Sequence, residues 1–242
     1  MRIFPLLRSA GFAALVAAIC AAPARSQGIN LGWDDCYQGT PAMMQTFACD
    51  SDAGPPFTLV ASFVPGPEID RVVALSAVFD LCTMPYALPD WWRVGTGDCR
   101  QGAISASFDF TSGPFSCADP WQGQAVGGVG AQVAVQGPTR LRLLVACALT
   151  APVAVEQGTE HYAFKIHILR TNTTTCAGCL TNACLVLNEM RLTPETGGND
   201  VFYYSPANNY YVTWQGVNQS PPCPFVVPTH TSSWGALKSL YH

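Results

Sequence analysis

The sequence has few charged residues and no long apolar run beyond its N-terminus. Only 12% of its 242 residues are charged, while 49% are hydrophobic. Such a low charge density argues against a disordered tail and against a nucleic-acid-binding protein. A membrane-spanning helix needs about 20 consecutive apolar residues. No such run follows the N-terminal segment, so we expect no membrane span in the mature chain.

The first 26 residues have the composition of a secretory signal peptide. Arg2 and Arg8 supply positive charge, a run of 12 apolar residues follows at 11–22, and small residues precede a cleavage position after Ser26. We therefore expect residues 1–26 to be removed on export to the periplasm, the cell envelope or the medium. Cleavage removes three basic residues and no acidic ones, which changes the net charge from −4 to −7. A negative surface repels nucleic-acid phosphates.

Cysteines are abundant for an exported chain of this length. Removal of Cys20 with the signal peptide leaves an even number, which predicts a disulfide framework. The mature cysteines are Cys36, Cys49, Cys82, Cys99, Cys117, Cys147, Cys176, Cys179, Cys184 and Cys223. Short intervening loops favour the pairs Cys36–Cys49 and Cys99–Cys117, and positions in strand-like runs favour a Cys82–Cys147 bridge between two sheets. The last four cysteines would then pair among themselves.

Extended runs alternate with turn residues throughout the mature chain, and helical periodicity is almost absent. The clearest alternation is at 103–110, where Ile104, Ala106, Phe108 and Phe110 share one face. Further runs lie at 57–64, 71–82, 127–135, 140–149, 161–170, 185–192 and 201–214, the last of these predicted to be a hairpin. About nine strands of this kind predict an all-β fold, an antiparallel two-sheet β-sandwich with long disulfide-pinned loops.

The domain organisation that we expect is simple. Residues 27–56 are rich in loop-forming residues and are predicted to pack on the sandwich, which occupies 57–242. A helical turn is expected at 119–122 with Asp119 as its cap, and a short C-terminal helix is expected at 233–241.

Two groups of residues have the chemistry of metal ligands. The spacing of Cys176, Cys179 and Cys184 resembles a zinc or thiol-redox motif, but an oxidising compartment favours disulfides. Loop carboxylates form the second group, and the expected Cys36–Cys49 bridge would bring them together as calcium ligands. These candidates are Asp34, Asp50 and Asp52. No other cofactor is expected, and solvated loop aspartates are the alternative interpretation of this group.

Aromatic residues are the main candidates for ligand contact. Trp91, Trp92 and Tyr211 could stack on sugar rings, or could fill the core or cover a sheet edge. Adjacent residues of an extended segment point in opposite directions, so one of the two tryptophans could lie in the core and the other could be exposed. The chain has no G-x-S-x-G motif, and its four histidines lie in no recognisable catalytic setting. Of these, His161 and His167 are expected to face solvent from one strand.

Several short motifs are similar to those of a known group of proteins. They are WDDC at 33–36, LPDWW at 88–92, DCRQG at 98–102, WQGQ at 121–124, CAGC at 176–179 and WGALKSLY at 234–241. On these motifs the chain resembles a group of uncharacterised exported, cysteine-rich bacterial proteins. The resemblance implies secretion and disulfides but no activity, ligand or catalytic residue. Strand patterning alone gives a looser likeness to cohesin-type and carbohydrate-binding sandwiches.

These observations favour a non-catalytic binding or structural protein of the cell envelope or the extracellular space. Strands, turns and bridges account for most of the distinctive residues, which leaves no assembled reactive site and argues against an enzyme. A carbohydrate-binding module and a secreted hydrolase with a non-local active site are the alternatives. The partner expected is a glycan or another envelope protein.

Overall fold

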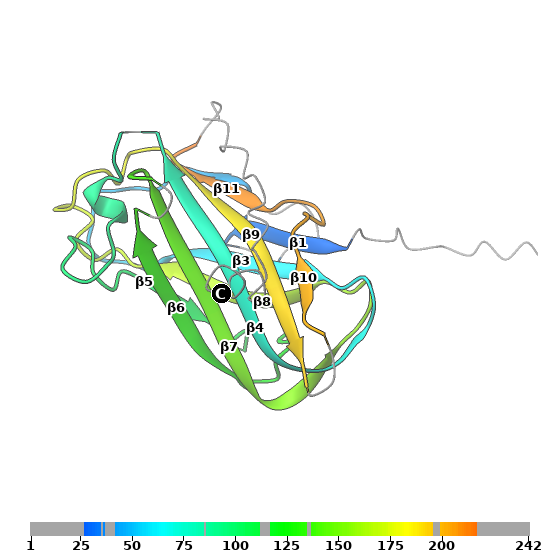
Figure 1. The fold of residues 1–242 in the computed structure, drawn as a ribbon. Coiled ribbons are helices and arrows are strands. Elements are labelled where there is room, and N and C mark those ends of the chain that lie inside the picture. Colours follow the sequence, from blue (N-terminus) through cyan, green and yellow to red (C-terminus); the bar gives the residue numbers. More distant parts are fainter. Residues whose placement is uncertain are drawn as a thin grey trace, which may run out of the picture.

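The computed structural model describes residues 27–34, 36, 42–84, 86–111, 117–134, 137–195 and 199–216. These ranges form strands that pack as two sheets face to face, and their only helix is the short 3-10 element η1 (Asp90–Trp92) (Figure 1). The predicted all-β, two-sheet fold is confirmed. The predicted signal peptide and C-terminal helix lie outside the described residues. No helix in the described ranges is long and apolar enough to cross a membrane.

The smaller sheet has four antiparallel strands in the order β1–β3–β8–β5. They are β1 (Gly28–Trp33), β3 (Phe57–Val64), β8 (His161–Ile168) and β5 (Ile104–Ser107). Side chains alternate between the core and the outer face along these two strands, and Thr58, Lys165 and His167 lie on the outer face. A register shift beside Ala61 interrupts the alternation in β8, where the adjacent residues Ala163 and Phe164 both lie in the core. The first strand, β1, lies in the segment for which the sequence predicts loops.

The larger sheet follows the order β2–β11–β9–β4–β7–β6, and β10 pairs with β9 beside this path. Its strands are β2 (Met44–Gln45), β4 (Ile69–Thr83), β6 (Ala125–Val133), β7 (Arg140–Val155), β9 (Ala183–Pro194), β10 (Val201–Tyr203) and β11 (Tyr211–Trp214). All neighbours are antiparallel except β2 and β11, which are parallel. The long strand β4 lies near the centre of this sheet, between β9 and β7.

The hydrophobic core lies between the two sheets. Phe79 and Leu81 of β4 face inward with Leu143 of β7, opposite Phe164 of β8, and each is at most 1% exposed. Burying a side chain of this size stabilises the fold by about 1.5–3 kcal/mol. The period-two pattern that predicts these strands is therefore the pattern that fills the core.

The segment 201–214 does not form the predicted hairpin. β10 pairs with the C-terminal part of β9, and β11 pairs with its N-terminal part. Between these two strands the chain crosses to the smaller sheet, where Ile29 donates to the carbonyl of Ser205 and Leu31 to that of Asn209. An edge strand such as β1 needs partners for its backbone groups, and this crossing segment supplies them.

Three disulfide bonds join described cysteines, and none has the predicted pairing. They are Cys36–Cys117, Cys49–Cys179 and Cys99–Cys176. The predicted pairs assume closure of short loops, whereas the real partners are 77 to 130 residues apart and are brought together by the sheets. Bridges across such long loops restrict the unfolded chain most in the entropic account. Cys184 is also disulfide-bonded, and Cys223 lies outside the described residues.

Cys82 and Cys147 do not join the two sheets, because both belong to the larger one. In the β4–β7 register, Cys82 lies opposite Arg140 and Cys147 lies opposite Leu75. That offset of seven residues separates the cysteines by about 24 Å along the strands, at about 3.4 Å per residue. Cys147 also faces the core while Cys82 faces outward, so the disulfide predicted for them is wrong and both thiols are free.

We expect mass spectrometry to find both of these thiols unpaired. Alkylation of the unfolded, unreduced protein should label the peptides that contain Cys82 and Cys147. In the native protein Cys147 should react slowly, because burial raises the pKa of its thiol to about 11 and only the thiolate is nucleophilic. A peptide in which Cys82 is cross-linked to Cys147 would contradict the register described above.

Candidate functional site

The two tryptophans predicted to contact a ligand are buried instead. Trp91 and Trp92 are 0% exposed and pack edge to face at 4.5 Å, with Trp91 also 4.6 Å from Trp214. Successive side chains of a 3-10 turn are about 120° apart rather than opposite, so η1 can direct both into the core. Both tryptophans fill the core, which confirms the alternative interpretation of these residues, and the hypothesis that one of them is exposed is wrong. Tyr211 of β11 is half-buried beside Tyr210.

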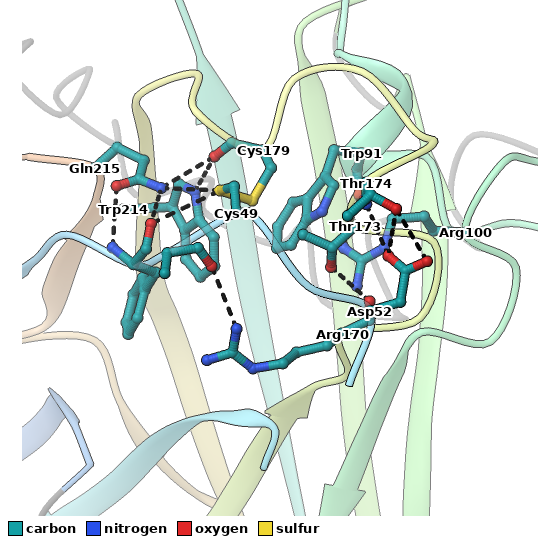
Figure 2. The surroundings of a disulfide bond; sticks show 12 residues. Cys49, Asp52, Trp91, Arg100, Arg170, Thr173, Thr174, Cys179, Trp214 and Gln215 are labelled. Atoms are coloured by element: carbon teal, nitrogen blue, oxygen red, sulfur yellow. Dashed lines mark hydrogen bonds between the residues drawn. A yellow bond between two sulfur atoms is a disulfide. The ribbon is translucent and has the colours of Figure 1, made fainter. Parts of the chain in front are cut away.

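A buried arginine lies beneath this aromatic cluster. The Arg100 side chain donates to the carbonyl of Trp91 at 3.0 Å, to that of Thr171 at 2.8 Å, and to that of Leu169. Its guanidinium carbon lies 3.8 Å from the centre of the Trp91 ring. Burial lowers the pKa of Arg100 to about 10, and Asp52 opposes that shift, so the group remains charged at neutral pH. Arg100 thus fixes the chain that leaves β8 (Figure 2).

The Cys49–Cys179 bridge fixes a second segment at the same end of the sandwich (Figure 2). Trp214 donates its indole N–H to the carbonyl of Cys179 at 2.7 Å. The Gln215 amide donates to the Phe47 carbonyl at 2.9 Å, and its oxygen accepts the Phe47 N–H at 3.1 Å. Residues 47–49 are therefore held to β11 and to the loop that precedes β9.

The three aspartates predicted as calcium ligands do not gather. Asp52 accepts hydrogen bonds from the backbone N–H of Thr174 at 2.7 Å and from its hydroxyl at 3.0 Å (Figure 2). Asp34 lies instead at the outer face of the smaller sheet, and the Cys36–Cys49 bridge that would unite it with Asp50 does not form. Among the described residues no three His, Cys, Asp or Glu side chains are placed to hold a metal ion.

The CxxC motif is structural in this fold. Cys176 is bonded to Cys99 and Cys179 to Cys49. Each cysteine of the motif therefore has a distant partner, which agrees with the prediction that these residues form disulfides rather than a zinc site or a dithiol redox pair.

A pocket of about 590 Å³ lies at the outer face of the smaller sheet, and residues 46–48 and 55–56 line it together with residues of β3 and β8. Its apolar walls come from Phe47, Ala48, Pro55, Pro56 and Phe57. The rings of Phe47 and Phe57 are 4.5 Å apart. This wall exists because the Cys49–Cys179 bridge and the Gln215 hydrogen bonds place Phe47 beside the first residue of β3.

The polar groups of the pocket come mainly from β8 and the chain that follows it. They are Lys165, His167 and Arg170, with Thr58 of β3 and Asp34 after β1. The Thr58 hydroxyl lies 3.1 Å from Nδ1 of His167, and the Asp34 carboxylate accepts the backbone N–H of Thr58 at 3.3 Å. Asp34 has a φ of 51°, which turns the chain at the end of β1.

Burial and the neighbouring cation set the charges in the pocket. Burial, and then the positive charge of Lys165, lower the pKa of His167 below its ordinary value, so the imidazole is neutral at neutral pH. Burial also lowers the pKa of Lys165, although Asp109 opposes this, and it raises the pKa of Asp34 against the hydrogen bond from Thr58. The lining contains two basic side chains, Lys165 and Arg170, and one acidic side chain, Asp34.

The Thr58–His167 contact supplies two members of a hydrolytic triad. Such a triad also needs an acid on the second nitrogen of the imidazole. Within the described chain, Nε2 of His167 has no carboxylate partner, because Asp34 binds the backbone N–H of Thr58 instead. Among the described residues, the Thr58–His167 contact is therefore not completed to a triad.

The residues of this pocket were not predicted from the sequence as one site. Alternation along 161–170 places Lys165 and His167 on the face away from the core, which the structure confirms. It also predicts that His167 faces solvent, and the structure leaves this side chain half-buried in the pocket lining. The one feature of the sequence that pointed to a pocket here was the expected packing of the N-terminal segment on the sandwich.

Replacement of Arg100 by methionine should strongly destabilise the fold. Three buried or partly buried carbonyl groups would lose their donor, and each costs about 1–3 kcal/mol, so we expect a loss of about 3 kcal/mol or more in urea unfolding. The matched control is Arg93→Met, which removes a half-exposed ion pair with Asp98 and should cost about 1 kcal/mol or less. Equal losses for the two variants would contradict the role given to Arg100.

Comparison with models of protein families, with curated proteins and with solved structures finds no match for this chain. Its function is therefore inferred from the geometry of its own residues, among which the pocket beside β8 is the principal candidate.

Proposed function

We propose that this chain is a non-catalytic exported binding protein, and that its ligand site is the pocket between residues 46–56 and the outer face of β3 and β8. The observation that carries the proposal is the pocket itself, with a volume of about 590 Å³. Small-molecule sites are usually clefts of about 300–1,000 Å³ with mostly apolar walls and a few convergent polar groups. This pocket has that composition.

The rigidity of the pocket rim supports the proposal. Arg170 donates to the carbonyls of Pro55 at 3.1 Å and Ala48 at 3.3 Å, so one side chain of the pocket holds both ends of the covering segment. The Cys49–Cys179 bridge fixes the same segment covalently. A pre-formed site loses less entropy on binding than one that must be ordered by its ligand.

Export agrees with the bonding of the cysteines. Seven of the described cysteines are disulfide-bonded, and such bonds persist in the periplasm, in the cell envelope and outside the cell. Together with the predicted signal peptide, they support a secreted or periplasmic protein that meets its ligand outside the cytoplasm.

The Ala48→Trp variant tests the assignment of the site. Ala48 is exposed at the pocket wall, so a large side chain there should fill the cavity without loss of core contacts. The probe is 8-anilinonaphthalene-1-sulfonate, followed by its fluorescence. We expect saturable binding to the wild type and binding about tenfold weaker to the variant, a difference of about 1.4 kcal/mol. Ala53→Trp, at another exposed position, is the control and should bind as the wild type does.

Unchanged binding of the probe to the Ala48→Trp variant would show that the pocket is not the site. Thermal unfolding of all three proteins separates this outcome from damage to the fold, because both substitutions are at the surface and should leave the unfolding temperature within a few degrees.

A carbohydrate-binding module remains the second candidate, at a different place from the one predicted. Phe202 and Tyr204 are 42% and 45% exposed, and their rings are nearly parallel, 3° apart in tilt, with centroids 5.9 Å apart. Arg191 lies 5.6 Å from the Phe202 ring. Exposed aromatic faces of this kind can stack on sugar rings. The pair is carried by β10 and the residue that follows it, far in sequence from Trp91 and Trp92.

Affinity electrophoresis in gels that contain soluble polysaccharides tests this second candidate. If the pair binds a glycan, the double variant Phe202→Ala/Tyr204→Ala should lose the retardation that the wild type shows. The control Tyr86→Ala removes a fully exposed tyrosine elsewhere and should keep it. Equal retardation of the double variant and the wild type would exclude these rings as the sugar contact.

A further inference from the structure

The charges of the pocket restrict the class of ligand that it can hold. Lys165 and Arg170 are cationic and Asp34 is the only carboxylate of the lining, so the lining carries a net positive charge although the mature chain as a whole carries −7. A cationic site on an anionic protein concentrates ligands of negative charge at that position.

Arg170 is held in an orientation that leaves donors for a ligand. Its guanidinium carbon lies 4.1 Å from the centre of the Phe57 ring, and Nε and one Nη bind backbone carbonyls. A guanidinium has five N–H donors. Within the described chain the other three have no protein partner. They can therefore donate to an acidic group without disturbing the pocket rim.

His167 provides a further polar contact from the same strand as Lys165. Its Nδ1 is engaged with the hydroxyl of Thr58, and among the described residues Nε2 has no hydrogen-bond partner. In the neutral imidazole one nitrogen donates and the other accepts. When Nδ1 accepts the hydroxyl proton of Thr58, Nε2 carries the proton and can donate to an anionic oxygen.

The apolar wall determines the rest of the ligand. Phe47, Pro55 and Pro56 supply the apolar groups on the covering side of the pocket. Flat apolar groups pack well against aromatic rings, by offset stacking or edge to face. The ligand that satisfies both halves of the site has an acidic group at one end and a planar apolar body at the other.

We propose that the pocket is selective for an organic anion, in which a carboxylate, sulfonate or phosphate group is attached to a planar apolar body. The acidic group lies against Lys165, Arg170 and Nε2 of His167, and the apolar body lies against Phe47, Pro55 and Pro56. This inference rests on the proposed function, because it names the ligand class of the same pocket. Asp34 disfavours a second acidic group near the end of β1.

The experiment compares two probes that differ only in charge. 2-Naphthoate and 2-naphthamide have the same ring and nearly the same shape, and ligand-observed NMR titration gives their affinities. We expect the wild type to bind the carboxylate about tenfold more tightly than the amide, which is the advantage of charge-assisted over neutral hydrogen bonds. Lys165→Met should remove most of that preference by weakening naphthoate binding alone.

Two controls accompany this comparison. Arg71→Gln removes one positive charge from an exposed ion pair with Glu195 on the other sheet, and should leave both affinities unchanged. Arg170 is kept intact because it also holds the pocket rim. Lys165→Met should fold, since it replaces a buried ammonium group by an apolar side chain of similar length.

The outcomes separate this inference from the proposed function. Equal binding of the two probes to the wild type, with both weakened by Ala48→Trp, would overturn anion selectivity and leave the pocket as the binding site. Binding of both probes that Ala48→Trp does not weaken would overturn the proposed function itself. A preference for naphthoate that disappears in Lys165→Met and persists in Arg71→Gln would support the inference.

Discussion

The disulfide between Cys49 and Cys179 joins two segments that hydrogen bonds between strands alone would leave apart. One is the chain between β1 and β3, which has only the two-residue strand β2, and the other is the loop that precedes β9. Phe47, two residues from the bridge, is held on both of its backbone polar groups by Gln215. Since Phe47 and Ala48 form part of the pocket wall, the pocket depends on this covalent link.

Arg100 has a comparable role for the side of the pocket that Arg170 forms. Its guanidinium holds the carbonyls of Leu169 and Thr171, the two neighbours of Arg170 in the chain. Arg100, which is 1% exposed, therefore fixes the backbone on both sides of Arg170 and with it the orientation of Arg170 toward the pocket. A buried cation has a desolvation cost, and here backbone carbonyls and the face of Trp91 offset it. The buried aromatic cluster thus supports one side of the pocket.

Local patterns predicted those features that depend on local geometry. The strand at 57–64 has the predicted bounds, and the runs at 140–149 and 161–170 lie within or largely coincide with β7 and β8. The same patterns did not predict which strands pair with one another. The aromatic segments on either side of Pro206 have the composition of a hairpin, yet each finds a longer partner in β9. Trp91 and Trp92 are buried because η1 replaces the extended backbone that alternation assumes.

The sequence by itself determined an all-β chain in which disulfides are expected, and it determined that Lys165 and His167 lie on the face of their strand that points away from the core. Only the tertiary structure decided which cysteines pair and that Cys82 and Cys147 stay free. It also decided that residues 46–48, residues 55–56 and Arg170 line one pocket with that face. The physical reason is the range of the interactions. Side-chain alternation is a property of neighbouring residues, whereas a pocket wall and a disulfide depend on contacts between segments up to 130 residues apart.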